Sequence, residues 1–175
     1  MHKRVRIILK RLSKRHKIKV IYKFKGLSGT AFHNRRAVNI PKNIDSAEKA
    51  LTALHEIGHI VNGDRSPRYY DEYLAERFAI RTAKLYGIVC DDYEFGAKCY
   101  VMWFICDDLK KKNISLNKIK PSVIRFVSDV FDFDDFKKRL KKGYSPHDYS
   151  CDQKKFKTKW RKKSAKSIRR SKETC

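Results

Sequence analysis

The sequence has 175 residues, with 43 Lys and Arg against 19 Asp and Glu, and a formal net charge of +24. No apolar stretch is long enough to cross a membrane, and the first residues lack the continuous apolar core of a secretory signal. The five cysteines are odd in number and include no C-x-x-C pair. This pattern argues against a disulfide framework or a second zinc site and favours reduced thiols, so we expect a cytoplasmic protein without a transmembrane segment.

The first part of the chain predicts a helix and then a strand. Residues 1–16 carry four apolar side chains at helical spacing, which would form a buried face: Val5, Ile8, Leu9 and Leu12. In residues 17–25 lysines alternate with apolar residues, and this period of two is typical of a half-exposed strand. The apolar members of the strand are Ile18, Val20, Tyr22 and Phe24.

A hairpin is predicted next. Residues 30–33 and 37–40 have strand character and flank Asn34 and Arg35, which suit a turn. With the preceding strand they would form a small antiparallel sheet, whose edge could pair with extended substrate backbone. His33 lies at the turn and could contact a substrate, but we interpret it as an exposed hairpin residue.

The most informative segment is His55-Glu56-Ile57-Gly58-His59, an H-E-x-x-H motif inside a predicted helix. Residues four apart share a helix face, so both imidazoles could bind one cation, while Glu56 stays close enough to act as a general base. The helix would begin after the capping sequence Asp45-Ser46-Ala47-Glu48 and end at Asn62-Gly63. Glycine in a helix interior costs about 1 kcal/mol relative to alanine, so Gly58 suggests close packing against this helix.

A third ligand is needed, because catalytic zinc sites usually take three protein ligands and leave a fourth position for water. Residues 69–87 predict a second helix, which the loop of residues 62–70 could lay beside the first. Glu72 and Glu76 lie one turn apart on this helix, so one could bind the metal while the other orients a ligand histidine. Its inward-facing side chains would be Leu74, Phe78 and Leu85.

These two helices together resemble the ImmA/IrrE metallopeptidases. The resemblance rests on His-Glu-Ile-Gly-His-Ile-Val-Asn-Gly-Asp at residues 55–64 and on Glu-Tyr-Leu-Ala-Glu-Arg-Phe-Ala at residues 72–79, within a match over residues 36–87. In that family H-E-x-G-H is followed by a helix of the form E-x-x-A-N/D-x-F-A. Two positions depart from the family pattern: Glu76 stands at the Asn/Asp position, and Leu74 stands before the alanine, where relatives often have Glu.

The resemblance implies a minimal zincin of the gluzincin type, in which two histidines and a glutamate bind zinc and the motif glutamate is the base. Carried over by position, the ligands are His55, His59 and Glu72, and Glu56 is the base. If Glu72 is not the third ligand, Glu76 is the next choice and Asp71 follows. The implied fold is α+β: a small antiparallel sheet, the H-E-x-x-H helix, a second ligand helix and further C-terminal helices.

The resemblance also implies a reaction. We expect a zinc-dependent endopeptidase that hydrolyses a peptide bond in a protein substrate, which could be a DNA-associated regulator, because such proteins often cleave a DNA-bound repressor in bacteria or mobile elements. A donor must stabilise the oxyanion, and Tyr69, Tyr70 or His147 could supply it.

The remaining chain predicts helices and then a basic tail. Residues 92–112 are rich enough in apolar groups to form a core helix against the zincin unit, Pro121 suits the first position of another helix, and Gly143 suits a helix end. We expect one zincin-like domain over residues 1–145. Residues 146–175 would be a disordered tail, because they lack a sustained apolar face.

Positive charge is unevenly distributed. Residues 1–44 carry 14 Lys and Arg and no acid, and residues 154–172 carry 11 and no acid. Such runs attract polyanions, and Phe156 and Trp160 could stack on bases, which favours nucleic acid over a solubilising role. A competing hypothesis is therefore a non-enzymatic nucleic-acid-binding protein on a zincin scaffold. Glu56 favours the enzyme, because a purely structural site would not need it.

Overall fold

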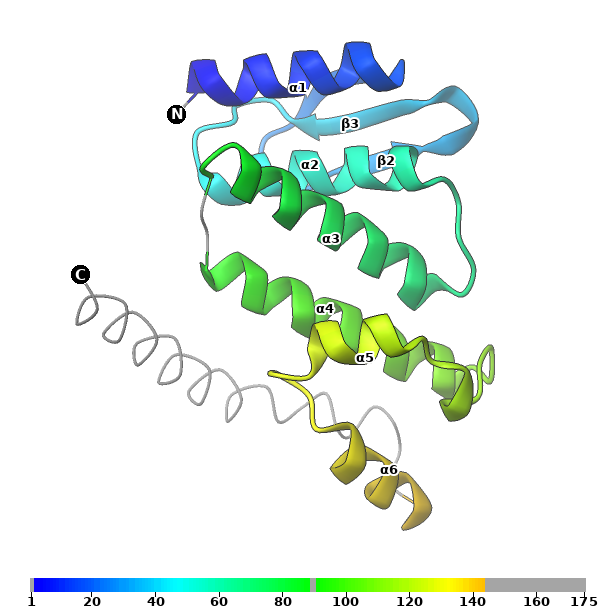
Figure 1. Ribbon diagram of the computed structural model, residues 1–175. Helices are drawn as coiled ribbons and strands as arrows, with labels where there is room; N and C mark the ends of the chain where they lie inside the picture. Colours follow the sequence, from blue (N-terminus) through cyan, green and yellow to red (C-terminus); the bar gives the residue numbers. More distant parts are fainter. Residues whose placement is uncertain (1, 89–90, 144–175) are drawn as a thin grey trace, which may run out of the picture. The chain divides into compact units, whose positions relative to one another are not determined.

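Figure 1 shows a computed structural model, which describes residues 2–88 and 91–143. The chain divides into two compact units, Met1–Glu94 and Phe95–Cys175. In chain order the elements are α1 (His2–His16), β1 (Lys19–Phe24), β2 (Thr30–Phe32), the short 3-10 helix η1 (His33–Arg35), β3 (Ala37–Pro41), α2 (Ala47–Asn62), α3 (Arg68–Leu85), α4 (Asp91–Lys110), a second 3-10 helix η2 (Leu116–Lys118), α5 (Pro121–Val127) and α6 (Phe133–Lys141).

The sheet of the first unit is mixed. Its strand order is β1-β3-β2, with β2 antiparallel and β1 parallel to β3. The predicted α+β class and the β2–β3 hairpin are confirmed, whereas the expectation of a purely antiparallel sheet is wrong. Residues 25–29 carry the chain from β1 across two strand spacings, about 10 Å, which leaves the central place for β3. All five residues of β3 are buried there.

Helix α1 supplies one wall of the core. Its predicted apolar face is confirmed, since Val5, Ile8, Leu9 and Leu12 are all buried. They belong to one cluster with Val38 and Ile40 of β3 and with the apolar side of α2. The H-E-x-x-H helix is therefore fixed from two directions, by α1 and by the central strand.

Helices α2 and α3 lie side by side (Figure 1). The side chain of Ser46 caps α2 by accepting a hydrogen bond from the Lys49 N–H at 3.3 Å, and Gly63 ends the helix at a φ of 72°. A Cβ on Gly58 would lie only 2.9 Å from the backbone oxygen of Ala75, so glycine permits this approach of the two backbones. The predicted close packing at Gly58 is confirmed.

The buried face of α3 differs from the predicted one. Leu85 is 78% exposed, while Leu74 and Phe78 are only partly buried. The helix instead turns a row of small side chains inward: Ala75, Ala79 and Ala83. Small residues allow α3 to approach α2 closely, and this row is out of phase with Leu85 on the helix.

The second unit is helical over its described residues. The aromatic and aliphatic side chains of α4 form much of its core, including Val101, Met102, Phe104 and Ile105. Pro121 starts α5 as predicted, and Asp132 caps α6 by accepting hydrogen bonds from the N–H groups of Asp134 and Asp135. Among the described residues, no helix combines the length and apolar character needed to cross a membrane. The predicted tail, with Phe156 and Trp160, lies outside the described residues.

Candidate metal centre

Two turns of α2 and one turn of α3 bring three potential ligands together. His55 and His59 lie one turn apart on α2, and their Nε2 atoms are 3.0 Å from each other. Glu72, on α3, places its Oε2 atom 3.4 Å from the Nε2 of His55 and 3.6 Å from that of His59. None of the three residues is more than 9% exposed, so the group is shielded from bulk solvent.

This triangle suits a tetrahedrally coordinated metal ion in size and in chemistry. Zn–N and Zn–O bonds of about 2.0–2.1 Å at tetrahedral angles separate ligand atoms by about 3.3 Å, and the three observed separations lie on either side of that value. The Oε2 atom of Glu72 is also buried, and its contacts with the two Nε2 atoms lack the geometry of a hydrogen bond. A buried acceptor without a donor is costly, and a bound cation would satisfy it. His55, His59 and Glu72 could therefore hold a metal ion.

Two further carboxylates, those of Asp71 and Glu76, contact the Nδ1 atoms of the two histidines. The Nδ1 atom of His59 lies 2.9 Å from Oδ2 of Asp71, and that of His55 lies 3.2 Å from Oε1 of Glu76. These contacts favour the tautomer in which Nε2 is free to bind a metal. Glu76 and Asp71, the two alternative ligands from the sequence, thus lie next to the Nδ1 atoms.

A tyrosine that the sequence did not single out supports this arrangement. The hydroxyl of Tyr93, at the start of α4, donates a hydrogen bond of 2.9 Å to Oε2 of Glu76. The contact joins residues 17 positions apart, so helical spacing within one element could not have revealed it. Its effect is to fix the carboxylate that in turn contacts His55.

The electrostatics of the group are those of an anionic pocket. Burial lowers the pKa of His55, but contacts with Glu72 and Glu76 outweigh burial and raise it to about 10. For His59, burial is likewise outweighed by contacts with Asp71 and Glu72, and the pKa rises to about 9. Burial raises the pKa of Glu72, but both histidines lower it more strongly, to about 2. The carboxylates thus stabilise positive charge at this point, whether a proton or a metal ion carries it.

Glu56 lies beside the ligands without belonging to their triangle. It is 9% exposed, and its carboxylate rests against Gly29, the residue that precedes β2. Burial raises the pKa of Glu56 above its usual value, and the neighbouring His55 and His59 only partly oppose this rise. A carboxylate with a raised pKa binds a proton more readily, as a general base must.

His33 differs from the sequence interpretation. It is partly buried, and its ring lies edge-on to that of His59 with 6.3 Å between the centroids, so the interpretation as an exposed hairpin residue is wrong. The hairpin that carries His33 packs against α2, the helix that carries His59. His33, His59 and Asp71 also form a second group that could hold a metal ion.

The predicted oxyanion donors are placed unequally. Tyr69 is 1% exposed, whereas Tyr70 is partly exposed and stacks on Tyr73 with 6.0 Å between ring centroids. Tyr70 is therefore the more accessible of the two tyrosines. His147 lies outside the described residues.

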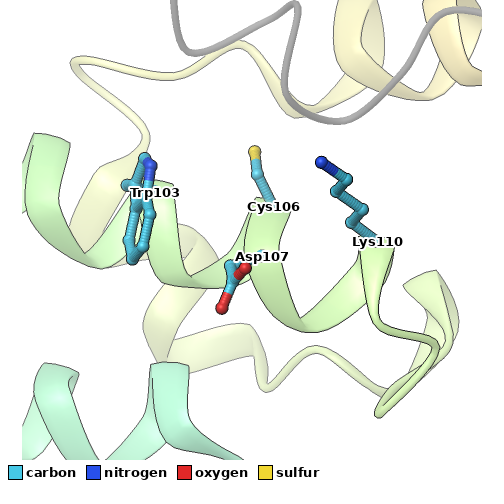
Figure 2. A pocket seen from close by; sticks show the side chains of 4 residues that line it. All are labelled: Trp103, Cys106, Asp107 and Lys110. Atoms are coloured by element: carbon cyan, nitrogen blue, oxygen red, sulfur yellow. The ribbon is translucent and has the colours of Figure 1, made fainter.

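A small pocket in the second unit offers no comparable chemistry. Figure 2 shows its lining side chains, all from one face of α4: Trp103, Cys106, Asp107 and Lys110. Burial raises the pKa of the Cys106 thiol to about 12, so this sulfur stays protonated and is a poor nucleophile or metal ligand. Asp107 is already paired with Lys111 at 2.7 Å. The group formed by His55, His59 and Glu72 is therefore a stronger candidate site than this pocket.

Comparisons with known protein families, with curated proteins and with solved structures find no match to this chain.

Proposed function

We propose that this chain is a zinc-dependent endopeptidase of the ImmA/IrrE type. The observation that carries the proposal is the convergence of the Nε2 atoms of His55 and His59 with Oε2 of Glu72, at separations of 3.0, 3.4 and 3.6 Å. Outer carboxylates on both Nδ1 atoms support a metal centre rather than a chance cluster, because ligand histidines usually have such partners.

The residues divide into those that would bind zinc and one that would move a proton. When bound, zinc supplies a Lewis acid that polarises the scissile carbonyl and lowers the pKa of water. A metal site with a purely structural role would not need Glu56. In a peptidase, Glu56 would take a proton from the attacking water and deliver it to the leaving amine. Its burial between α2 and Gly29 favours that exchange by raising its pKa.

A DNA-associated regulator is the substrate class that the family resemblance suggests. The alternative, a non-enzymatic nucleic-acid-binding protein on a zincin scaffold, would use the same metal only for stability. Glu56 distinguishes the two functions, because only the peptidase depends on its carboxylate.

The test compares the purified protein with its Glu56→Gln variant. Both should contain about one zinc per chain and melt at the same temperature, because the ligands are unchanged. On a peptide library analysed by mass spectrometry, the variant should cleave about 10²-fold to 10⁴-fold more slowly, the usual contribution of a general base. Equal cleavage by the two proteins would remove Glu56 from the mechanism and the peptidase proposal with it.

A further inference from the structure

The other unusual surface of the first unit is formed by α1 and β1. Every Lys and Arg between residues 4 and 42 is exposed. No acidic residue precedes Asp45, and none of these cations forms an ion pair with a carboxylate of the described residues. We define the basic face as the exposed cations of these two elements: Arg4, Arg6, Lys10, Arg11, Lys14, Arg15, Lys19 and Lys23.

The fold fixes the direction in which this face points. Because Val5, Ile8, Leu9 and Leu12 turn one side of α1 into the core, the opposite side must face solvent. Helical geometry places Lys10 and Lys14 near the centre of that solvent side, beside the exposed Ile7, and Arg11 closer to its edge. The guanidinium of Arg6 lies 5.6 Å from the centre of the Tyr22 ring on β1, so the helix and strand present one continuous surface.

Further contacts concentrate positive charge near the end of α1. Arg36, from the β2–β3 connection, donates a hydrogen bond of 2.6 Å from Nη2 to the backbone oxygen of His16. Burial lowers the pKa of His16, and the positive charges of Arg15 and Arg36 lower it further. A neighbouring imidazole thus experiences the positive field of this surface.

We propose that the basic face of α1 and β1 binds the phosphate backbone of duplex nucleic acid. Helix α1 is about 22 Å long at 1.5 Å per residue, and a duplex carries one negative charge for about every 1.7 Å of its axis, so several phosphates lie within reach at once. Arginine, which supplies four of the seven Lys and Arg residues of α1, can bind phosphate through two parallel hydrogen bonds.

Two features favour duplex nucleic acid over other polyanions. A helix that binds a bilayer surface inserts a broad apolar side, but that side of α1 is already buried in the core, and its solvent side exposes one large apolar residue, Ile7. Single-stranded nucleic acid is usually held by aromatic rings that stack on bases. The exposed ring of this face, Tyr22, already has the guanidinium of Arg6 over it.

The test uses the full chain and a fluorescently labelled DNA duplex across a salt series. The triple variant Lys10→Gln, Arg11→Gln, Lys14→Gln removes three neighbouring cations of the basic face. Its matched control, Arg125→Gln, Lys138→Gln, Lys142→Gln, removes three exposed cations from the second unit and lowers the net charge equally. Each neutralised phosphate contributes about −0.9 to the slope of log K against log salt, so the α1 triple should make the slope less negative by about 2–3.

We expect the α1 triple to lower duplex affinity by about tenfold or more near 0.1 M salt, and the control triple to change it by less than about twofold. An equal loss in both triples would mean that only net charge matters, and no loss in the α1 triple would place binding elsewhere in the chain. Either result overturns the proposal.

Two additional sets of measurements identify which polyanion binds and test duplex binding independently of the proposed peptidase activity. Tighter binding to a single strand than to the duplex would overturn the assignment to duplex nucleic acid. The assignment would also be overturned if the α1 triple weakened binding to anionic lipid vesicles but left duplex binding unchanged. Glu56→Gln and removal of metal should leave duplex affinity unchanged, because the basic face shares no residue with the metal centre. Failure of one proposal therefore does not imply failure of the other.

Discussion

The carboxylate of Glu56 occupies the space that a side chain at Gly29 would fill. A Cβ added to Gly29 would overlap Cγ of Glu56 and would lie 2.5 Å from its Oε1 atom. Gly29 comes directly before β2, so the hairpin and the H-E-x-x-H helix meet at the proposed base. The missing side chain at residue 29 therefore determines where the Glu56 carboxylate can rest.

Gly29→Ala should displace this carboxylate, because the end of a glutamate side chain moves more easily than the backbone around it. We expect unchanged zinc content and melting temperature, but peptide cleavage slower by about tenfold to 100-fold, since small misplacements of a catalytic group are costly. Gly26→Ala is the matched control, because its Cβ would meet no atom within 4 Å. Equal losses in both variants, or none in Gly29→Ala, would contradict this role.

Zinc binding should distinguish the ligands from the carboxylates behind them. We expect His59→Ala to lose the metal and Glu72→Ala to weaken it strongly, because each removes one corner of the triangle. Glu76→Gln and Asp71→Asn should lower affinity by about 10-fold to 100-fold, as is usual for partners of ligand histidines. The measurement is competition with a chromophoric chelator. Full zinc content in Glu72→Ala together with loss in Glu76→Ala would reassign the third ligand.

The stability of the metal-free protein should fall as pH rises. The pKa values of His55 and His59 are raised to about 10 and about 9 in the fold, so their protonation favours the folded state most fully below their usual value of 6.5. That contribution is lost as pH rises through 9 and 10. Thermal unfolding in the presence of a chelator should show this decline, and Glu76→Gln should reduce the part that depends on His55.

Zinc affinity should change in the opposite direction over the same pH range. A proton between the two Nε2 atoms, which are 3.0 Å apart, must leave before a metal ion can bind there. We therefore expect at least about one proton released per zinc at pH 7.5. Calorimetry in buffers of different ionisation enthalpy measures this number. A binding enthalpy independent of the buffer would show that the histidines are already neutral.

Local sequence signals predicted the elements and the candidate ligands because those signals act over one or two helical turns. The H-E-x-x-H spacing places His55 and His59 on one face of any helix, and Ser46 marks where that helix begins. The apolar face of α1 follows equally from its own periodicity. No tertiary information is needed for such features.

The sequence did not predict the features that depend on how helices and strands pack against one another. The alternation in β1 is the same for a parallel or an antiparallel neighbour, so it could not reveal the β1-β3-β2 order. Large apolar residues suggested Leu85 as an inward residue of α3, but close approach to α2 selects small ones. Two contacts at the site each join separate elements, so no local sequence pattern predicts them: Tyr93 with Glu76, and Gly29 with Glu56.

Gly58 and Gly96 provide a final contrast, because both lie inside helices and differ in what surrounds them. Replacing a glycine inside a helix with alanine should stabilise it by about 0.5–1 kcal/mol on helix propensity alone. Gly96 follows that rule, because its Cβ would meet no atom within 4 Å. At Gly58 the added Cβ would lie 2.9 Å from the backbone oxygen of Ala75 and 3.0 Å from its Cα. Overpacking of this kind usually costs about 1–3 kcal/mol, so the sign should reverse.

The two variants should also differ at the metal centre. Gly58 lies between His55 and His59 on α2, and the backbone that it touches belongs to the helix that carries Glu72. Gly58→Ala should push α3 away from α2, lengthen the His–Glu separations and weaken zinc binding. Gly96→Ala should leave zinc affinity unchanged. Melting temperatures and zinc competition on both variants measure the two effects. Unaltered zinc affinity in a destabilised Gly58→Ala protein would mean that the ligand triangle does not depend on the α2–α3 separation.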